Sequence, residues 1–192
     1  MKYIVVVALF LTSGLLNAVT LEAAKGKTEF HAVGWPSAIN VHGQGQGPKG
    51  EISLSKVNGK VTMNGEIQMD LSTFTTGMET RDSHMKDKYL EVEKFKLATL
   101  SFKDVEIPLN VLNSGGEINL AGNLNLHGEV QPVELKMELK NKDGKVTSAS
   151  RFKINMSAFK IDRPRFALVT VDDEVKITTT TEISLRDLKE VL

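Results

Sequence analysis

Apolar and polar residues alternate along most of the chain from Lys27 onward. Residues 60–71 show the pattern most clearly: Val61, Met63, Ile67 and Met69 fall on one face, and the residues on the other face are polar. A period of two is typical of a β-strand with one buried face. Strands of this one-sided kind belong to antiparallel sheets, because parallel strands are covered on both faces.

The same alternation recurs along the chain, and residues suited to tight turns separate several of its runs. Asn58-Gly59, Gly115-Gly116 and Asp143-Gly144 each lie between two alternating runs, where a hairpin needs residues that tolerate positive φ. Successive strands are therefore predicted to pair as hairpins. The predicted strands are 28–33, 39–44, 50–57, 60–71, 97–107, 117–127, 132–140, 146–156 and 173–185.

One short stretch breaks the succession of strands. A helix of about two turns is predicted over residues 83–89, and it is too short to cover a sheet of eight or nine one-sided strands. Such a sheet must curl onto itself to bury its apolar face. The sequence therefore predicts an all-β fold, an extended antiparallel β-barrel of about eight strands, closed, with the short helix near one opening. Residues 43–50, rich in glycine, are expected to form a bend or a flexible rim rather than a phosphate-binding loop, because a strand and not a helix follows them.

Composition narrows the function classes. The 192 residues fit one domain, and 24 basic residues balance 24 acidic ones. Nucleic-acid binding is not expected, because it depends on concentrated positive charge. The chain has no cysteine, so disulfides and thiolate metal sites are excluded.

The N-terminus has the pattern of a secretory signal. Lys2 precedes an apolar run, residues 4–16, that is too short for a membrane span of roughly 20 residues. We expect residues 1–18 to be a cleaved signal peptide and residues 19–192 to form a single domain, with Ala24 as a second candidate boundary. An uncleaved anchor or a buried first helix is the alternative. Export, in bacteria to the periplasm, follows from the first interpretation.

Candidate chemistry is sparse. The four histidines lie far apart without metal-binding spacing, and His127 falls on the polar face of its predicted strand, so no metal site is expected. No serine lies in a nucleophile motif, and no enzymatic activity is expected. The densest polar group is Arg81, Asp82 and His84. Its structural interpretation has Asp82 or Ser83 capping the short helix and Arg81 paired with Glu79; in the catalytic one Asp82 would orient His84.

The apolar face of the strands offers a candidate binding surface. Methionines lie among its aliphatic residues, and methionine adapts to flexible apolar partners. A barrel lined in this way suits a long lipid tail, although a fully packed interior would have the same pattern. The residues predicted to line the lumen are Met63, Ile67, Met69, Leu120, Leu124, Leu135, Met137, Ile154 and Met156.

Several motifs follow one another along the chain: TGMETRDSHM at 76–85, YLEVEKF at 89–95, GNLNLHGEVQPV at 122–133, FKINMSAF at 152–159 and DDEVKI at 172–177. Together they resemble the YceI-like family of periplasmic lipid- and polyisoprenoid-binding proteins. The resemblance implies a lipocalin-like barrel with an apolar lumen for a polyisoprenoid or similar amphiphile. It also implies a link with isoprenoid quinones or a membrane cytochrome b561-type partner. The chain departs from the family pattern where Lys96 replaces a proline, and where Met156 and Lys160 replace an arginine and a glycine.

Together these features predict a periplasmic carrier or sequestering protein. The tail would lie in the lumen and the polar head near Arg81, Asp82 and His84, with no cofactor required beyond a bound isoprenoid lipid or quinone. The alternatives are a secreted interaction module with a filled barrel core, and an enzyme acting through Asp82 and His84. Exposed strand edges near the glycine-rich stretch would permit a homodimer.

Overall fold

The computed structural model describes residues 17–21, 25–36, 39–57, 60–142, 145–166 and 168–184. Most of the predicted signal peptide therefore lies outside the described residues. Its last two residues, Asn17 and Ala18, belong to the strand β1 and pair with β4.

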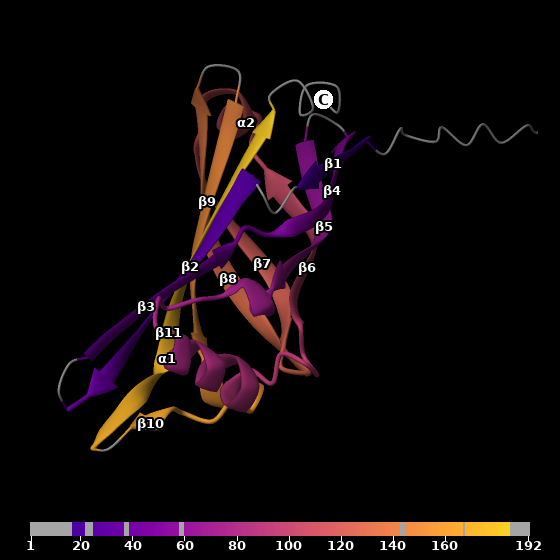
Figure 1. Ribbon diagram of the computed structural model, residues 1–192. Helices are drawn as coiled ribbons and strands as arrows, with labels where there is room; N and C mark the ends of the chain where they lie inside the picture. Colours follow the sequence, from indigo (N-terminus) through magenta and orange to yellow (C-terminus); the bar gives the residue numbers. More distant parts are fainter. Residues whose placement is uncertain are drawn as a thin grey trace, which may run out of the picture.

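The described chain forms one curled sheet of 11 strands, in the order β1-β4-β5-β6-β7-β8-β9-β11-β2-β3, with β10 paired to β11 (Figure 1). All of the strand pairs are antiparallel, as predicted. The bounds are β1 Asn17–Leu21, β2 Gly26–Trp35, β3 Ile39–Gln46, β4 Lys49–Val57, β5 Lys60–Asp70, β6 Leu97–Ile107, β7 Gly116–Leu126, β8 Glu129–Lys142, β9 Lys145–Asn155, β10 Arg165–Phe166 and β11 Val169–Ser184.

The alternation of the sequence becomes the two faces of this sheet. In β7, Ile118, Leu120 and Leu124 are buried inside the barrel, while the polar residues between them face outward. Because side chains alternate across a strand, this register buries the apolar face and leaves the polar face to water. The predicted all-β antiparallel fold is confirmed, and the described residues form 11 strands where nine strand ranges were predicted.

The sheet is not closed in the described residues, contrary to the predicted closed barrel. No continuous ladder joins β3 to β5 in the described residues; a single bridge between Gln44 and Thr75 spans the gap, with N···O distances of 2.9 and 2.8 Å. At the end of β5 the Asp70 carboxylate accepts a hydrogen bond from the backbone N–H of Ser72. The chain then forms the 3₁₀ helix η2, Leu71–Thr73, and the two edge strands of the sheet, β1 and β3, are not paired with each other in the described residues.

Two short helical segments cover the two ends of the barrel. The predicted helix exists but begins earlier: α1, Glu79–Ser83, runs directly into a π-helical turn η3, His84–Tyr89, at the lower end in Figure 1. A second helix, α2, Leu109–Ser114, lies at the opposite end and was not predicted. It buries Val111 and Leu112 against the barrel.

The glycine-rich stretch was predicted as a bend or rim, and most of it is strand. β3 extends to Gln46, and only Gly47 and Pro48 turn the chain into β4. A Cβ atom at Gly43 would lie 2.1 Å from the Phe30 ring, and one at Gly45 would lie 2.2 Å from the Phe74 ring. These glycines therefore make room for two aromatic rings that stack with their centroids 5.7 Å apart.

Candidate functional site

A cavity of about 550 Å³ occupies the end of the barrel beneath α1 and η3. Its walls are mainly apolar. They come from strands throughout the sheet and from the helical segment α1–η3. The lining residues are Thr28, Phe30, Ala32, Ile39, Val41, Met69, Leu71, Phe74, Thr76, Met78, Thr80, Arg81, His84, Met85, Tyr89, Leu90, Ala98, Leu124, Leu126, Phe152, Ile154, Met156, Ile161, Pro164, Arg165, Phe166, Val169, Val171, Val175 and Ile177.

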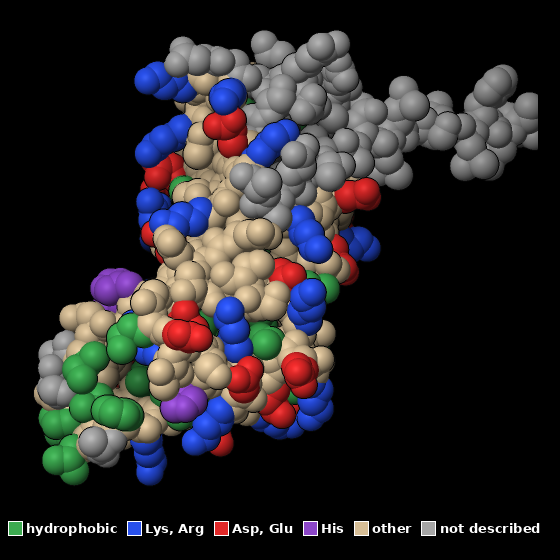
Figure 2. Space-filling model, viewed as in Figure 1, with side chains coloured by type: hydrophobic (Ala, Val, Ile, Leu, Met, Phe, Trp, Pro, Cys, Tyr) green, Lys and Arg blue, Asp and Glu red, His purple; other side chains and the backbone are tan. Residues whose placement is uncertain are grey.

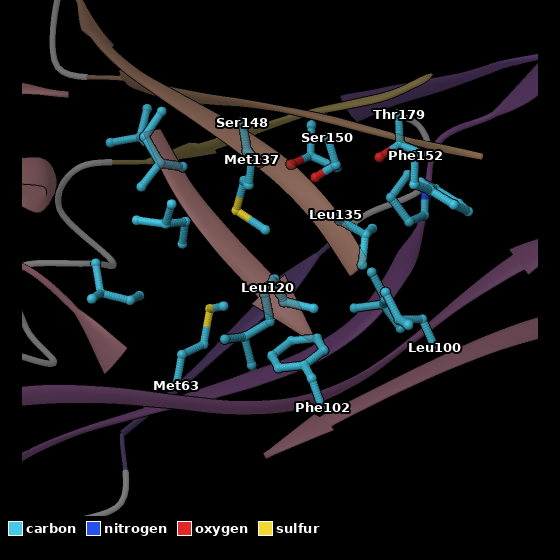
Figure 3. A pocket seen from close by; sticks show the side chains of 18 of the residues that line it. Met63, Leu100, Phe102, Leu120, Leu135, Met137, Ser148, Ser150, Phe152 and Thr179 are labelled. Carbon is cyan, nitrogen blue, oxygen red and sulfur yellow. The ribbon is translucent and has the colours of Figure 1, made fainter. Parts of the chain in front are cut away.

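A second, much smaller cavity of about 80 Å³ lies toward α2. Met69 and Phe152 line both cavities and so mark the boundary between them. In Figure 3, Met63, Leu120 and Phe102 face Ser148, Ser150 and Thr179 across this smaller space. The lumen is thus nearly filled by side chains at the α2 end and open at the α1 end.

This division separates the residues that the sequence grouped together. Five of the predicted lining residues, Met63, Ile67, Leu120, Leu135 and Met137, line the small cavity, and Met69 lines both. Five others line the large cavity: Leu124, Ile154, Met156, Arg81 and His84. Asp82 lines neither cavity.

The Asp82 carboxylate instead anchors the segment that leads into α1. It accepts hydrogen bonds from the hydroxyl of Thr75, from the backbone N–H of Thr76 at 2.7 Å and from the Thr76 hydroxyl at 2.5 Å. Burial alone would raise the pKa of this carboxyl, but the hydrogen bonds from Thr75 and Thr76 outweigh burial and lower the pKa below its ordinary value. Asp82 is therefore held as an anion that fixes the start of α1. We call α1 and η3, which lie over the large cavity, the lid.

Arg81 belongs to the same network and also faces the cavity. Its Nε–H donates to the Thr76 hydroxyl oxygen at 2.7 Å, and a terminal N–H donates to the Thr76 carbonyl at 3.0 Å. Arg81 thus bonds to Thr76 and not, as predicted, to Glu79, and the N-cap of α1 is Met78, without a side-chain hydrogen bond. The guanidinium has five N–H donors, so these two bonds leave donors for an anionic or polar group at the cavity wall.

Buried hydroxyl groups form a polar strip inside the otherwise apolar barrel. Strand register places Thr28 beside Thr179, Thr179 beside Ser150, and Thr181 beside Ser148. Thr28 is fully buried, lines the large cavity, and its hydroxyl has no hydrogen-bond partner. The other four side chains line the small cavity. A polar ligand atom or water reaching this strip would find a hydroxyl group able to donate and accept.

The histidines lie at separate places. His31 and His42 stack on the barrel exterior with ring centroids 4.3 Å apart, and His84 faces the large cavity. His127 was predicted on the polar surface, but its side chain is only 11% exposed. Its backbone turns at φ 54°, and its ring nitrogens lie 3.1 Å from the Phe159 carbonyl oxygen and 2.8 Å from a Glu91 carboxylate oxygen.

Among the residues that the structure describes, no group of three or more His, Asp or Glu side chains comes close enough to hold a metal ion. No helix in these ranges is long and apolar enough to cross a membrane.

Several lining residues were not singled out from the sequence. Phe30, Phe74 and Tyr89 reach the cavity from β2, from the chain after β5 and from η3. Strand alternation places Val175 and Ile177 on the apolar face and could have found them, whereas Phe74 and Tyr89 lie outside any strand and carry no periodic signal. Three further lining residues come from a segment that lies outside the predicted strands; they are Arg165, Phe166 and Val169.

Comparison with known proteins decides the family. A family model described as the YceI-like domain matches residues 20–183. The chain belongs to the YceI-like family. The match covers the sheet from β2 to all but the last residue of β11, so the resemblance seen in the motifs is confirmed.

Solved structures share the fold of this YceI-like chain at low sequence identity. Burkholderia cenocepacia BcnA superposes with a TM-score of 0.67 at 18% identity, over 85% of this chain and 99% of that one. A polyisoprenoid binding domain from Saccharophagus degradans gives 0.67 at 13%, over 88% and 98%. The Campylobacter jejuni YCEI protein gives 0.54 at 21%, over 76% and 85%. No curated protein sequence matches the chain.

Proposed function

We propose that this protein binds a long-chain isoprenoid lipid, or a similar amphiphile, in the large cavity and carries or sequesters it. The observation that supports the proposal is the cavity of about 550 Å³ with predominantly apolar walls. Its size falls within the roughly 300–1,000 Å³ of typical ligand pockets. The similar Saccharophagus degradans structure is described as a polyisoprenoid binding domain, which agrees with this ligand class.

Burial of the tail supplies enough free energy for useful affinity. About ten methylene groups at about 0.8 kcal/mol each contribute roughly 8 kcal/mol before ordering costs, which corresponds to about micromolar binding. Met69, Met85 and Met156 give the walls side chains that adapt to a flexible tail. The polar head would lie at the cavity edge, where Arg81 and His84 line the wall.

This proposal refines the prediction from sequence. The tail occupies the α1 end of the lumen, so Leu124, Ile154 and Met156 contact it, while Leu120, Leu135 and Met137 pack the opposite end. Asp82 contributes by positioning Arg81 through Thr76 rather than by touching the ligand.

The interior favours a binding protein over the two alternatives. A filled core would leave no cavity of this size beneath α1. An Asp82–His84 acid–base pair would need the carboxylate to orient the imidazole, whereas its oxygens accept from Thr75 and Thr76. A periplasmic location, a cytochrome b561-type partner and a homodimer stay part of the proposal as predictions.

Native mass spectrometry of protein purified without detergent, followed by organic extraction, tests the binding function. A bound species of defined mass, released by extraction, is expected. A ligand-free mass that also persists after prenyl alcohols and quinones are added would contradict the proposal.

A tryptophan placed in the cavity tests the location. Ile154 is half-buried and faces the large cavity, so Ile154→Trp should fill tail space and weaken uptake at least tenfold. Val130→Trp is the matched control, since Val130 is exposed and lines neither cavity. Equal uptake by both variants, with both folded by circular dichroism, would place the tail elsewhere.

A further inference from the structure

Two turns beside the mouth of the large cavity expose large apolar side chains. Trp35 at the end of β2 is 72% exposed, Phe166 at the end of β10 is 83% exposed and Leu168 is 91% exposed; Ile39 at the start of β3 is also exposed. Figure 2 shows hydrophobic side chains gathered at the lower left, over the ends of these strands. We call Trp35, Ile39, Phe166 and Leu168 the apolar rim.

Strand pairing brings the two turns together. Thr170 of β11 pairs with Trp35 of β2 on one side and with Arg165 of β10 on the other, and Gly34 pairs with Ile39 of β3. The rim therefore belongs to one continuous piece of sheet. In Figure 1 these strand ends project beyond the barrel, next to α1. Leu168, Trp35 and Phe166 are consequently presented on a protrusion rather than in a groove.

The rim is continuous with the cavity. Ile39 and Phe166 belong to it and also line the cavity, as do their neighbours Arg165 and Val169. A surface that covered the rim would therefore lie directly at the cavity opening.

Charge in the two turns favours an anionic surface. The segments 33–41 and 163–171, which carry the rim, have Arg163 and Arg165 as their charged residues, and Asp162, Asp172 and Asp173 flank the second segment. Arg163 is tied to the Val171 carbonyl, with an N···O distance of 2.9 Å, while Arg165 lies exposed beside Phe166. Apolar side chains flanked by arginine fit the apolar–polar boundary of a bilayer that contains anionic lipid.

We propose that the apolar rim is a docking site for the surface of a lipid bilayer. Trp35, Phe166 and Leu168 insert at the level of the headgroups and upper acyl chains, a depth that suits the amphipathic indole ring. Arg165 lies at the phosphate level. The docked protein directs the opening of the large cavity into the membrane. The docking surface shares Ile39 and Phe166 with the cavity wall, but its test needs no ligand.

The single tryptophan of the chain makes the rim its own probe. Vesicles of phosphatidylethanolamine and phosphatidylglycerol should shift the Trp35 emission to shorter wavelength, and brominated lipids should quench it. The protein should float with these vesicles in a density gradient, and float less with vesicles of phosphatidylcholine alone.

Leu168→Ser isolates the rim, because Leu168 is exposed and lines neither cavity. It should lower vesicle partitioning about tenfold, the loss expected when one buried leucine side chain is removed. Val130→Ser, another exposed apolar position, should partition like the wild type. Uptake of a short-chain prenyl alcohol from solution should be equal in all three proteins, which separates a failure of docking from a failure of ligand binding.

Three results would overturn the proposal. The first is wild-type protein that neither floats nor shifts its emission with either vesicle. The second is Leu168→Ser partitioning as well as the wild type. The third is a blue shift on concentration without vesicles, together with a doubled mass in solution that Leu168→Ser abolishes. That last result would assign the rim to a second copy of this chain.

Discussion

Thr76 and Asp82 are joined twice: the backbone N–H of Thr76 donates to Oδ1 of Asp82 at 2.7 Å, and the Thr76 hydroxyl donates to the same oxygen at 2.5 Å. The same hydroxyl oxygen accepts from Nε of Arg81 at 2.7 Å. One threonine therefore connects the anion that starts the lid to the cation that faces the cavity. The network explains why an arginine and an aspartate occur next to each other in a segment that covers an apolar lumen.

Removing this hydroxyl should weaken the lid. Thr76→Val keeps the size of the side chain but leaves a charged carboxylate and a guanidinium each short of one hydrogen bond. Hydrogen bonds to charged groups contribute about 1.5–3 kcal/mol, so the free energy of unfolding should fall by about that amount. Urea denaturation of both proteins measures this loss in the free energy of unfolding. The control Thr147→Val, at an exposed position of β9, should change the free energy of unfolding by less than about 0.5 kcal/mol. An equal loss of stability in the two variants would refute the role of the network.

The lowered pKa of Asp82 predicts an acid-sensitive lid. Burial acts to raise this pKa, but the hydrogen bonds from Thr75 and Thr76 prevail and hold it below the unfolded value. A lowered native pKa gives a contribution to stability that is complete above the unfolded pKa, roughly 4, and is lost as the pH falls through the native pKa. The difference in unfolding free energy between wild type and Asp82→Asn should therefore be largest near neutral pH and shrink on acidification to about pH 3.

Comparing the two proteins at each pH removes the contribution of other carboxyl groups. Asp70 also has a lowered pKa, because burial is outweighed by hydrogen bonds from Ser72 and by the nearby Lys96, and it titrates equally in both proteins. A difference that stays constant between neutral pH and pH 3 would show that the Asp82 charge does not stabilise the lid.

The sequence predicted the sheet far better than the site. Strand β7 could be predicted because an alternating apolar face has one stable solution, and that face is buried as expected. The incomplete closure could not be predicted in this way. Closure depends on whether the two edge strands, β1 and β3, lie in register beside each other, and the alternation within each strand carries no information on that pairing.

The cavity was predictable in kind but not in place. Met137 and Ile154 look alike in sequence, since both lie on the apolar face of a strand, yet one lines the filled end and the other the open end. The filled end lies beside α2, which was not predicted from the sequence and whose Leu112 lines the small cavity. His127 was misplaced for a similar reason: its strand ends at Leu126, so at φ 54° its side chain no longer follows the alternation.

The orphan hydroxyl of Thr28 predicts a stabilising substitution. Its Oγ1 is buried without a partner, and leaving a buried polar group unpaired costs about 1–3 kcal/mol. Thr28→Val has almost the same shape and should raise the unfolding free energy of ligand-free protein by about 1 kcal/mol. Thr180 lies on the outer face of β11, so the control Thr180→Val should leave the unfolding free energy nearly unchanged. A destabilised Thr28→Val would show that the hydroxyl is satisfied in solution by water or by a ligand.

Leu120 tests whether the two ends of the lumen have different roles. Its side chain is 1% exposed and lines the small cavity, where packing is nearly complete. Leu120→Ala should lower the free energy of unfolding by about 2–5 kcal/mol, because it removes buried methyl groups and leaves a void. Leu97→Ala, at an exposed position of β6, should lower it much less. If the tail is confined to the α1 end, Leu120→Ala should leave prenyl lipid uptake unchanged under conditions where the variant is fully folded. Increased uptake, or a preference for longer chains, would instead show that the tail passes Met69 and Phe152 into the filled end.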